Sequence, residues 1–195
     1  AGADANGPPE TAVVAARRLV DHRAIRLEPD RIAFARRGMA ATLNGIAQGY
    51  ITDRVAERLR AEGMTQVLVD LGEIRALGRH PDGRAWQVGL EDPRQPGGTA
   101  LTLQVENRAV ATSGGYGTRF DGQGRFSHLF DPVTGRCVSY WLSVTVLAAD
   151  ATTADALSTA LSVVPVERAA GIVQRHRAVT ARLTAADGTV GILES

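Results

Sequence analysis

The middle of the chain is a run of short segments with the residue pattern of β-strands, and segments with a helical pattern stand on both sides of it. The strand candidates lie between residues 67 and 148 and are separated by turn signals such as Pro81-Asp82-Gly83 and Pro96-Gly97-Gly98. The helix candidates are 10–22, 45–62, 152–163 and 166–176. Because the strands are grouped instead of alternating with helices, the pattern predicts an α+β fold.

Charge and residue usage exclude several classes of protein. The chain has 195 residues, with 22 Lys+Arg, 21 Asp+Glu and a net charge of +1, which gives no reason to expect nucleic acid as a partner. All the basic residues are arginine, so a Schiff-base lysine and a P-loop lysine are excluded. The single Cys137 excludes an internal disulfide and a paired-cysteine zinc site. No run approaches the roughly 20 apolar residues of a membrane helix, so we expect no transmembrane segment.

Two segments precede the strands. Residues 1–9 are small, polar and proline-ended, and we expect a flexible lead-in followed by one domain over 10–195. The helix over 45–62 is predicted to begin at an Asn44 N-cap and to carry Asp53 on its solvated face. Its predicted buried stripe consists of Ala47, Tyr50, Ile51, Val55 and Leu59.

Thr112, Ser113 and Gly114 begin a glycine-rich loop that follows a strand candidate. Glycine lets the backbone approach a ligand closely, and consecutive amides can cradle an anion. The alternative is a plain hairpin turn, which composition by itself favours.

His128 and Asp131 form a second candidate, next to a proline turn. The segment 125–130 is expected to be a strand, which would direct the two side chains to opposite faces unless the turn relaxes it. Histidine can exchange a proton near pH 7. The alternative is a structural histidine beside an aspartate that caps its own turn.

Asp155 and Thr159 are four residues apart on a predicted helix and therefore share one face. A carboxylate with a hydroxyl one turn away offers two hard oxygens, which suit Mg²⁺. The alternative, which spacing alone favours, is an aspartate in the first helical turn, where the helix dipole stabilises it.

Five segments together, in this order, resemble the ApbE family of FAD:protein FMN transferases. They are LNGIAQGYITDRVAERLRAEG (43–63), VLVDLGEIRALGRHPDGRAWQVGLEDP (67–93), AVATSGGYGTRF (109–120), FSHLFDPVTGR (126–136) and SVTVLAADATTADALSTAL (143–161). The resemblance implies an α+β fold of the ApbE type, T-fold-like, with mixed or antiparallel sheets and packed helices. It also implies that 10–195 corresponds to the C-terminal portion of the family's full length.

The activity implied by the resemblance is Mg²⁺-dependent transfer of FMN from FAD to a threonine hydroxyl of an acceptor protein, with release of AMP. The implied acceptor is a flavoprotein of a membrane electron-transfer complex, and the implied location is the periplasm. Two alternatives stay open: a Mg²⁺-dependent FAD pyrophosphatase, and a flavin-binding or scaffold protein without turnover.

The implied site residues follow from the matching segments. Gly45 matches a position whose carbonyl completes the metal site, with Asp155 and Thr159 as the other Mg²⁺ ligands. His128 and Asp131 match a segment beside the active site. The implied flavin-binding residues are Thr112, Ser113, Gly114, His128 and Asp131. Either His128 or Asp155 is expected to take the proton of the threonine hydroxyl.

The segment 42–49 departs from the family's frequent DLGGIAKG pattern. It reads TLNGIAQG, so that Gln48 stands where the family often has a lysine. The uncharged amide changes the contacts available to a flavin or a phosphate. This version resembles the NosX-like members of the family.

Overall fold

A six-stranded antiparallel sheet forms the centre of the computed structural model, which describes residues 7–95, 97–118, 120 and 126–195. The strands lie in the order β10-β9-β8-β7-β4-β3, and every neighbouring pair is antiparallel. Their bounds are β3 Val67–Asp70, β4 Ile74–Leu77, β7 Ala109–Ser113, β8 Ser143–Ala148, β9 Thr180–Thr184 and β10 Val190–Glu194. The predicted α+β class with antiparallel sheets is thereby confirmed.

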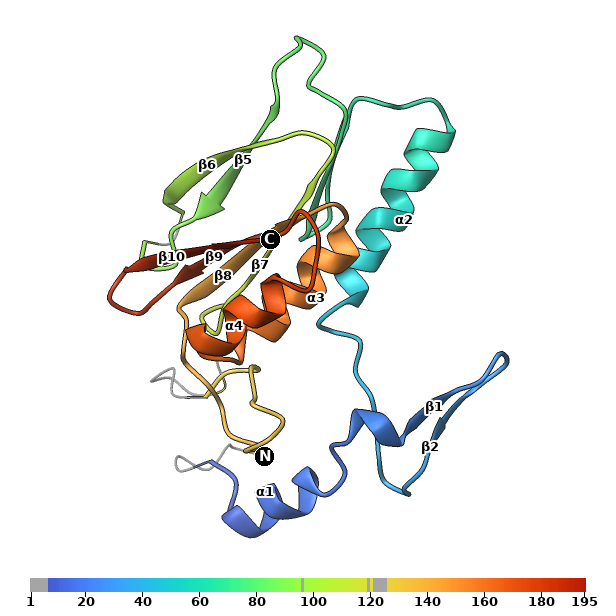
Figure 1. The fold of residues 1–195 in the computed structure, drawn as a ribbon, viewed down its shortest axis with the longest axis vertical. Coiled ribbons are helices and arrows are strands. Elements are labelled where there is room, and N and C mark those ends of the chain that lie inside the picture. The colour runs from blue at the N-terminus through green and yellow to red at the C-terminus, as the bar shows by residue number, and fades with distance from the viewer. Residues whose placement is uncertain (1–6, 96, 119, 121–125) are drawn as a thin grey trace.

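Helices cover one face of this sheet, and a two-stranded ribbon covers the other (Figure 1). The helices are α2 (Ala47–Ala61), α3 (Ala151–Ser162) and α4 (Val166–Val173). The ribbon pairs β5 (Trp86–Glu91) with β6 (Thr99–Val105). The domain therefore has three layers, with the six-stranded sheet in the middle.

Alternation along the central strands separates the two cores. In β7, Ala109 and Ala111 pack under the helices while Val110 packs under the ribbon. In β8, Val146 belongs to the helix side and Leu147 to the ribbon side. This two-residue period is that of a sheet buried on both faces. The small alanines of β7 leave room for α3 to lie close to the sheet.

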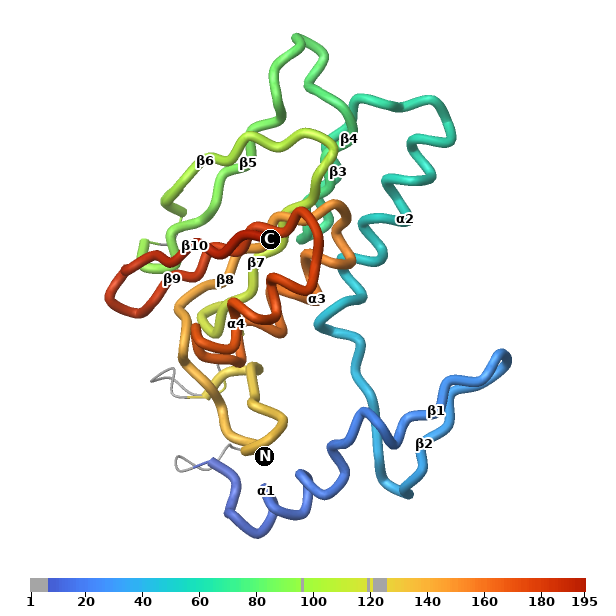
Figure 2. Tube along the Cα trace, viewed as in Figure 1, coloured from blue at the N-terminus to red at the C-terminus, as the bar shows by residue number. Residues whose placement is uncertain are grey.

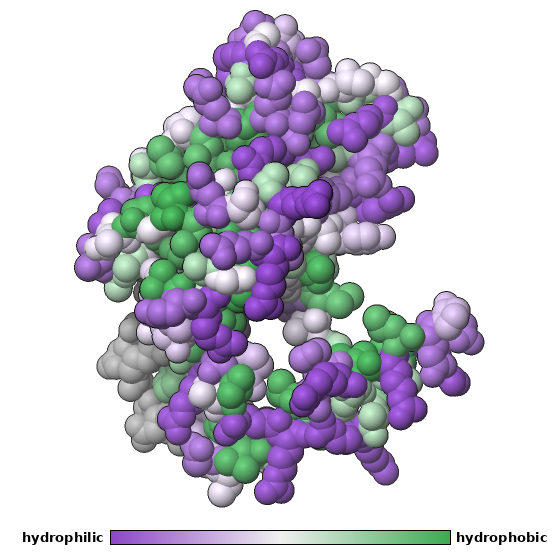
Figure 3. All heavy atoms as spheres, viewed as in Figure 1, coloured by the Kyte–Doolittle hydropathy of each residue, from purple (hydrophilic) through white to green (hydrophobic). Residues whose placement is uncertain are grey.

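The N-terminal part of the chain forms an arm below the sheet. It contains α1 (Glu10–Arg17), the short 3₁₀ helix His22–Ala24 and the hairpin of β1 (Ile25–Leu27) with β2 (Ile32–Phe34). Figure 2 shows the extended connection that leads from this hairpin to α2. In the space-filling view of Figure 3, a hollow separates the hairpin from the body on this face. The predicted helix over 10–22 is shorter than expected, because α1 ends at Arg17. It is also more exposed, since no residue of α1 is buried.

The most deeply buried residues of α2 are not those of the predicted stripe, of which only Ala47 and Leu59 are partly buried. The structure buries Gly49, Thr52, Asp53 and Ala56. The apolar residues of the predicted stripe that are instead exposed are Tyr50, Ile51 and Val55. The physical reason is that α2 packs closely on α3, a contact that requires small side chains and specific polar partners.

The start of α2 also differs from the prediction. Ile46 occupies the N-cap position and makes no capping hydrogen bond through its side chain, so the predicted Asn44 cap is wrong. Among the described residues of the predicted strand 125–130, Phe130 makes one isolated bridge to Cys137 and no strand forms. Residues 121–125 lie outside the described residues. Side-chain bonds compete with strand pairing there, because Ser127 Oγ accepts from the backbone of Leu129 at 3.3 Å.

Within the described residues, no helix combines the length and apolar composition that crossing a membrane requires.

The position of the core predicts that the same substitution changes the free energy of unfolding by different amounts at two sites. Leu161 of α3 is fully buried, whereas Leu27 of the arm hairpin is 79% exposed. We expect Leu161→Ala to lower the free energy of unfolding by about 2–5 kcal/mol, since it opens a cavity. Leu27→Ala is expected to change it by less than about 0.5 kcal/mol. Urea unfolding followed by circular dichroism measures both, and equal losses would contradict the assignment of the core.

Candidate functional site

A cavity of about 530 Å³ lies where the start of α2, the end of β7, the start of β4 and helix α3 meet. Nearly all of the predicted site residues line it, namely Gly45, Thr112, Ser113, Gly114, His128, Asp155 and Thr159. These residues come from segments more than 100 positions apart in the chain. Asp131 is the one predicted site residue that is not part of the lining.

Asp155 lies at the deep end of the cavity and is only 4% exposed. Its Oδ2 accepts a hydrogen bond of 2.9 Å from the backbone N–H of Gly49. A side chain at position 49 is impossible, since its Cβ would lie 2.2 Å from the carbonyl oxygen of Ala151. Burial raises the pKa of Asp155, and the Gly49 N–H opposes this effect. A nearby cation would stabilise the charged form of such a buried carboxylate.

Thr159 and Gly45 lie together beside Asp155. A Cβ on Gly45 would approach Thr159 Cγ2 to 2.9 Å, so the glycine permits the close contact. Thr159 Oγ1 lies 3.3 Å from Ser113 Oγ. In the described part of the chain, no group of three or more His, Cys, Asp or Glu side chains is placed to hold a metal. Asp155, Thr159 and Gly45 offer one carboxylate, one hydroxyl and one backbone carbonyl, which is a hard donor set that fits Mg²⁺.

Thr112 and Ser113 are the last residues of β7 and not, as predicted, the start of the glycine-rich loop, and their hydroxyl contacts hold the strand end from which the loop leaves. Ser113 Oγ lies 2.7 Å from Ser158 Oγ, and Thr112 Oγ1 lies 2.9 Å from Thr145 Oγ1. These contacts leave the backbone of the loop, including Gly114, at the cavity wall. Tyr116 lines the same wall, and burial raises the pKa of its phenol. Tyr116 was not predicted as a site residue, although it stands within the glycine-rich segment.

His128 and Asp131 separate in the structure. His128 is exposed in a loop, not on the predicted strand, and its Nδ1 lies 3.5 Å from the carbonyl oxygen of Thr118. Asp131 accepts hydrogen bonds from Val133 N at 2.8 Å and Thr134 Oγ1 at 2.9 Å. Burial acts to raise the pKa of Asp131, but these hydrogen bonds together bring it below its usual value. The geometry of Asp131 is therefore that of an aspartate capping its own turn.

Glu73 is a site residue that sequence reasoning missed. It directly precedes β4, is 8% exposed and lines the cavity. Burial, followed by the charge of Asp155, raises the pKa of Glu73 to about 8. In the sequence, Glu73 is marked only by its place after Gly72, between two strand candidates. Gln48 also lines the cavity, and its Nε2 donates to the carbonyl of Leu71 at 2.9 Å.

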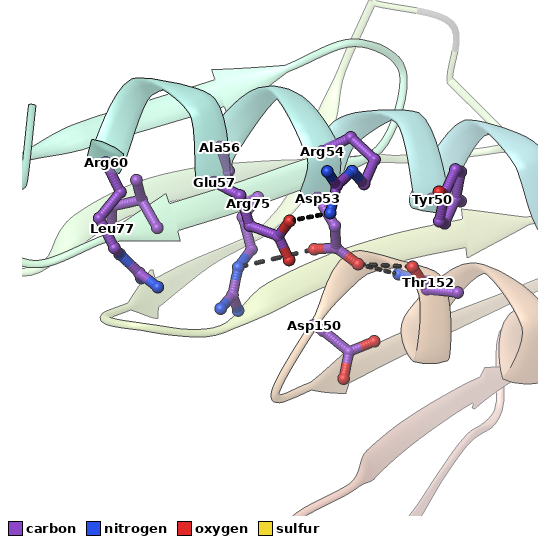
Figure 4. A pocket seen from close by; sticks show the side chains of 10 residues that line it. All are labelled: Tyr50, Asp53, Arg54, Ala56, Glu57, Arg60, Arg75, Leu77, Asp150 and Thr152. Carbon is purple, nitrogen blue, oxygen red and sulfur yellow. Dashed lines mark hydrogen bonds and ion pairs between the residues drawn. The ribbon is translucent and has the colours of Figure 1, made fainter. Parts of the chain in front are cut away.

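Behind the site, Asp53 joins α2 to the start of α3 (Figure 4). Its carboxylate accepts from Ala151 N at 2.9 Å, and from Thr152 N at 2.8 Å and Thr152 Oγ1 at 2.6 Å. Arg75 Nε lies 3.7 Å from Asp53 Oδ1, and the Arg75 guanidinium also donates to the carbonyl of Ala149. The predicted solvated position of Asp53 is therefore wrong, because the N–H groups that begin α3 need an acceptor. These residues border a second cavity of about 360 Å³.

Because Asp53 caps the start of α3, we expect its substitution to lower stability much more than that of a second acidic residue on α2. Asp53→Ala leaves the N–H groups of Ala151 and Thr152 without their acceptor and removes the carboxylate beside Arg75, which keeps its bond to the carbonyl of Ala149. We expect the free energy of unfolding to fall by about 3 kcal/mol. The control Glu57→Ala removes an exposed partner of Arg54 and is expected to cost less than about 1 kcal/mol. Chemical denaturation compares the two, and a cost for Asp53→Ala no larger than the control's would refute the capping role.

The raised pKa of Glu73 predicts a pH dependence of stability in the presence of EDTA. The unfolded chain releases this proton near the ordinary pKa of 4.5, whereas the folded chain holds it to about 8. The wild type should therefore lose stability relative to Glu73→Gln as the pH rises from about 5 to about 8. Urea unfolding at several pH values measures the difference. Parallel curves for the two proteins would be the contrary result, and Glu62→Gln, on an exposed helix end, serves as the control.

Comparison with known proteins points to one family. The model of the ApbE family matches residues 1–183. The FAD:protein FMN transferase of Haemophilus influenzae is 37% identical over 139 residues, which are 69% of this chain and 40% of that protein. The enzyme of the same name from Treponema pallidum is 36% identical over 165 residues, which are 78% of this chain and 46% of that protein.

Solved structures agree in fold. The ApbE protein of Thermotoga maritima superposes with a TM-score of 0.87 at 27% identity, over 96% of this chain and 62% of that one. The flavin transferase ApbE of Vibrio cholerae gives 0.78 at 30% identity, over 96% and 61%. The chain thus spans less than half the length of the two curated relatives and about three fifths of the two solved chains. With a family match over most of its residues and the same fold, the chain belongs to the ApbE family.

Proposed function

We propose that this chain transfers FMN from FAD to a threonine hydroxyl of an acceptor protein, releases AMP and depends on Mg²⁺. The observation that carries the proposal is the cavity in which Asp155, Thr159 and Gly45 meet the end of β7 and Gly114. The name FAD:protein FMN transferase, which the curated relatives carry, supports the same reaction.

In this proposal Asp155, Thr159 and the backbone of Gly45 hold the cation. When bound, Mg²⁺ supplies positive charge to the pyrophosphate and to the leaving AMP. The donor set fits because it consists of hard oxygens, one of them a buried carboxylate. The end of β7 at Thr112 and Ser113, with Gly114 directly after it, would lie along the flavin nucleotide.

The reaction forms a bond between the threonine oxygen and the phosphorus of FMN, and it breaks the phosphorus–oxygen bond to AMP. The proton of the threonine hydroxyl must leave as the new bond forms. We assign it to His128, because this imidazole is exposed at the edge of the cavity, where a protein acceptor can reach it. Asp155 is the less suitable base, since it is buried and engaged by the Gly49 N–H.

For the biological setting we propose the periplasm and an acceptor flavoprotein of a membrane electron-transfer complex. Gln48, which stands where the family often has a lysine, supports a place among the NosX-like members. The role in flavin binding that the resemblance implies for Asp131 is not part of this proposal, because its carboxylate is engaged in its own turn.

A flavin-transfer gel tests the function. The chain is mixed with FAD, Mg²⁺ and an acceptor domain that bears the target threonine, and the denatured acceptor is examined for fluorescence. We expect a fluorescent band that disappears with EDTA. Asp155→Ala is expected to reduce its rate of formation at least about 100-fold, since a cation ligand is lost. The matched control, Asp187→Ala in the exposed β9–β10 turn, should transfer at the wild-type rate.

Other outcomes of the same experiment identify the alternatives. AMP released without an acceptor, and no labelled band, would indicate an FAD pyrophosphatase. Tight FAD binding without any AMP would indicate a flavin-binding or scaffold protein. Full activity of Asp155→Ala would refute the metal assignment.

A further inference from the structure

We propose that Glu73 is the second anionic group of the cation site, and that its free carboxylate oxygen holds a water molecule bound to the cation that Asp155 ligates. This inference deepens the proposed function and rests on it.

The first observation is an unsatisfied oxygen. Glu73 is more than nine-tenths buried, and its Oε2 is fully buried without a hydrogen-bond partner among the described residues. Leaving a buried carboxylate oxygen unpaired is costly, so each such group in a native fold calls for a ligand. Glu73 lines the cavity, which places that ligand in the cavity.

A purely structural role for Glu73 would not explain both of its carboxylate oxygens. A hydrogen bond from the backbone of Thr112 stabilises the charged carboxylate, and Thr112 belongs to β7, the neighbour of β4 in the sheet. The side chain thus continues the contact between these strands just before the point where their pairing begins. That contact leaves Oε2 unused.

The second observation is the charge around the cavity. The negative charges of Asp155 and, more weakly, Asp70 act on Glu73, and the described lining residues include no arginine. The proposed substrate brings a further negative charge with its pyrophosphate. Two buried carboxylates and a pyrophosphate can all carry their charges when a positive charge lies among them. A divalent cation removes all three conflicts at once.

The position of Glu73 favours a bridging water over direct ligation. The proposed ligands Asp155 and Thr159 belong to α3, and Gly45 precedes α2, whereas Glu73 enters from the sheet. Mg²⁺ usually keeps several of its waters and takes only one or two carboxylates from a protein. An acceptor such as Glu73 Oε2 would orient one of these waters, as the outer ligands of metal sites do.

Metal affinity tests this inference without reference to activity. Mn²⁺ is the probe, its binding to the whole chain is followed by electron paramagnetic resonance, and Mg²⁺ is the competitor. We expect Glu73→Gln to weaken Mn²⁺ binding about 10-fold or more, while the thermal melt shows a folded protein. Glu62→Gln, the same change on an exposed helix end, should bind as the wild type does. Wild-type affinity of folded Glu73→Gln would overturn the inference.

Asp155→Asn separates this inference from the proposed function. Loss of Mn²⁺ binding in Asp155→Asn, together with wild-type binding in Glu73→Gln, would refute only the role of Glu73. Wild-type binding in Asp155→Asn would refute the cation site itself, and the role of Glu73 with it. If Glu73→Gln fails to fold, Glu73→Asp keeps the charge and withdraws the oxygen by one methylene. Weakened binding is expected there, and wild-type affinity would count against the bridging water.

Discussion

The close contact of α2 with the beginning of α3 is the constraint on which the candidate site depends. Gly49 allows the two backbones to approach, and its N–H then binds the carboxylate of Asp155. One turn further along α2, Asp53 accepts the N–H groups that open α3. A helix start without acceptors is unfavourable when buried, so these bonds fix the position of α3. The cavity-facing residues of α3 take their places from that position.

The cavity has two parts that differ in structure, which we call its floor and its wall. The floor consists of helix residues that are buried and mutually bonded, such as Asp155. The wall includes the loop after β7, which Ser113 and Thr112 anchor through hydroxyl contacts, and the exposed loop of His128. A buried floor beside an exposed loop would suit the proposed transfer, in which a small nucleotide is held and a protein acceptor approaches.

Much of the site could be predicted, because its residues stand in short segments with recognisable patterns. Asp155 and Thr159 have helical spacing, and the structure places both at the cavity. Asp131 could not be placed, since the choice between facing a ligand and capping a turn depends on the path of the loop. Glu73 was missed because a single acidic residue between two strands has no local signature. Its importance arises from burial and from the nearby charge of Asp155.

By itself, the sequence determined the class of fold, the order of most of the elements and most of the predicted residues that line the cavity. Only the tertiary structure decided which face of α2 is buried. Its apolar residues Tyr50 and Ile51 are exposed, whereas Gly49 and Asp53 are buried. The partners of these two residues lie 106 and 98 positions away. Helical periodicity describes only neighbours along one helix, so it cannot reveal that a small and polar face meets the N-terminus of a distant one.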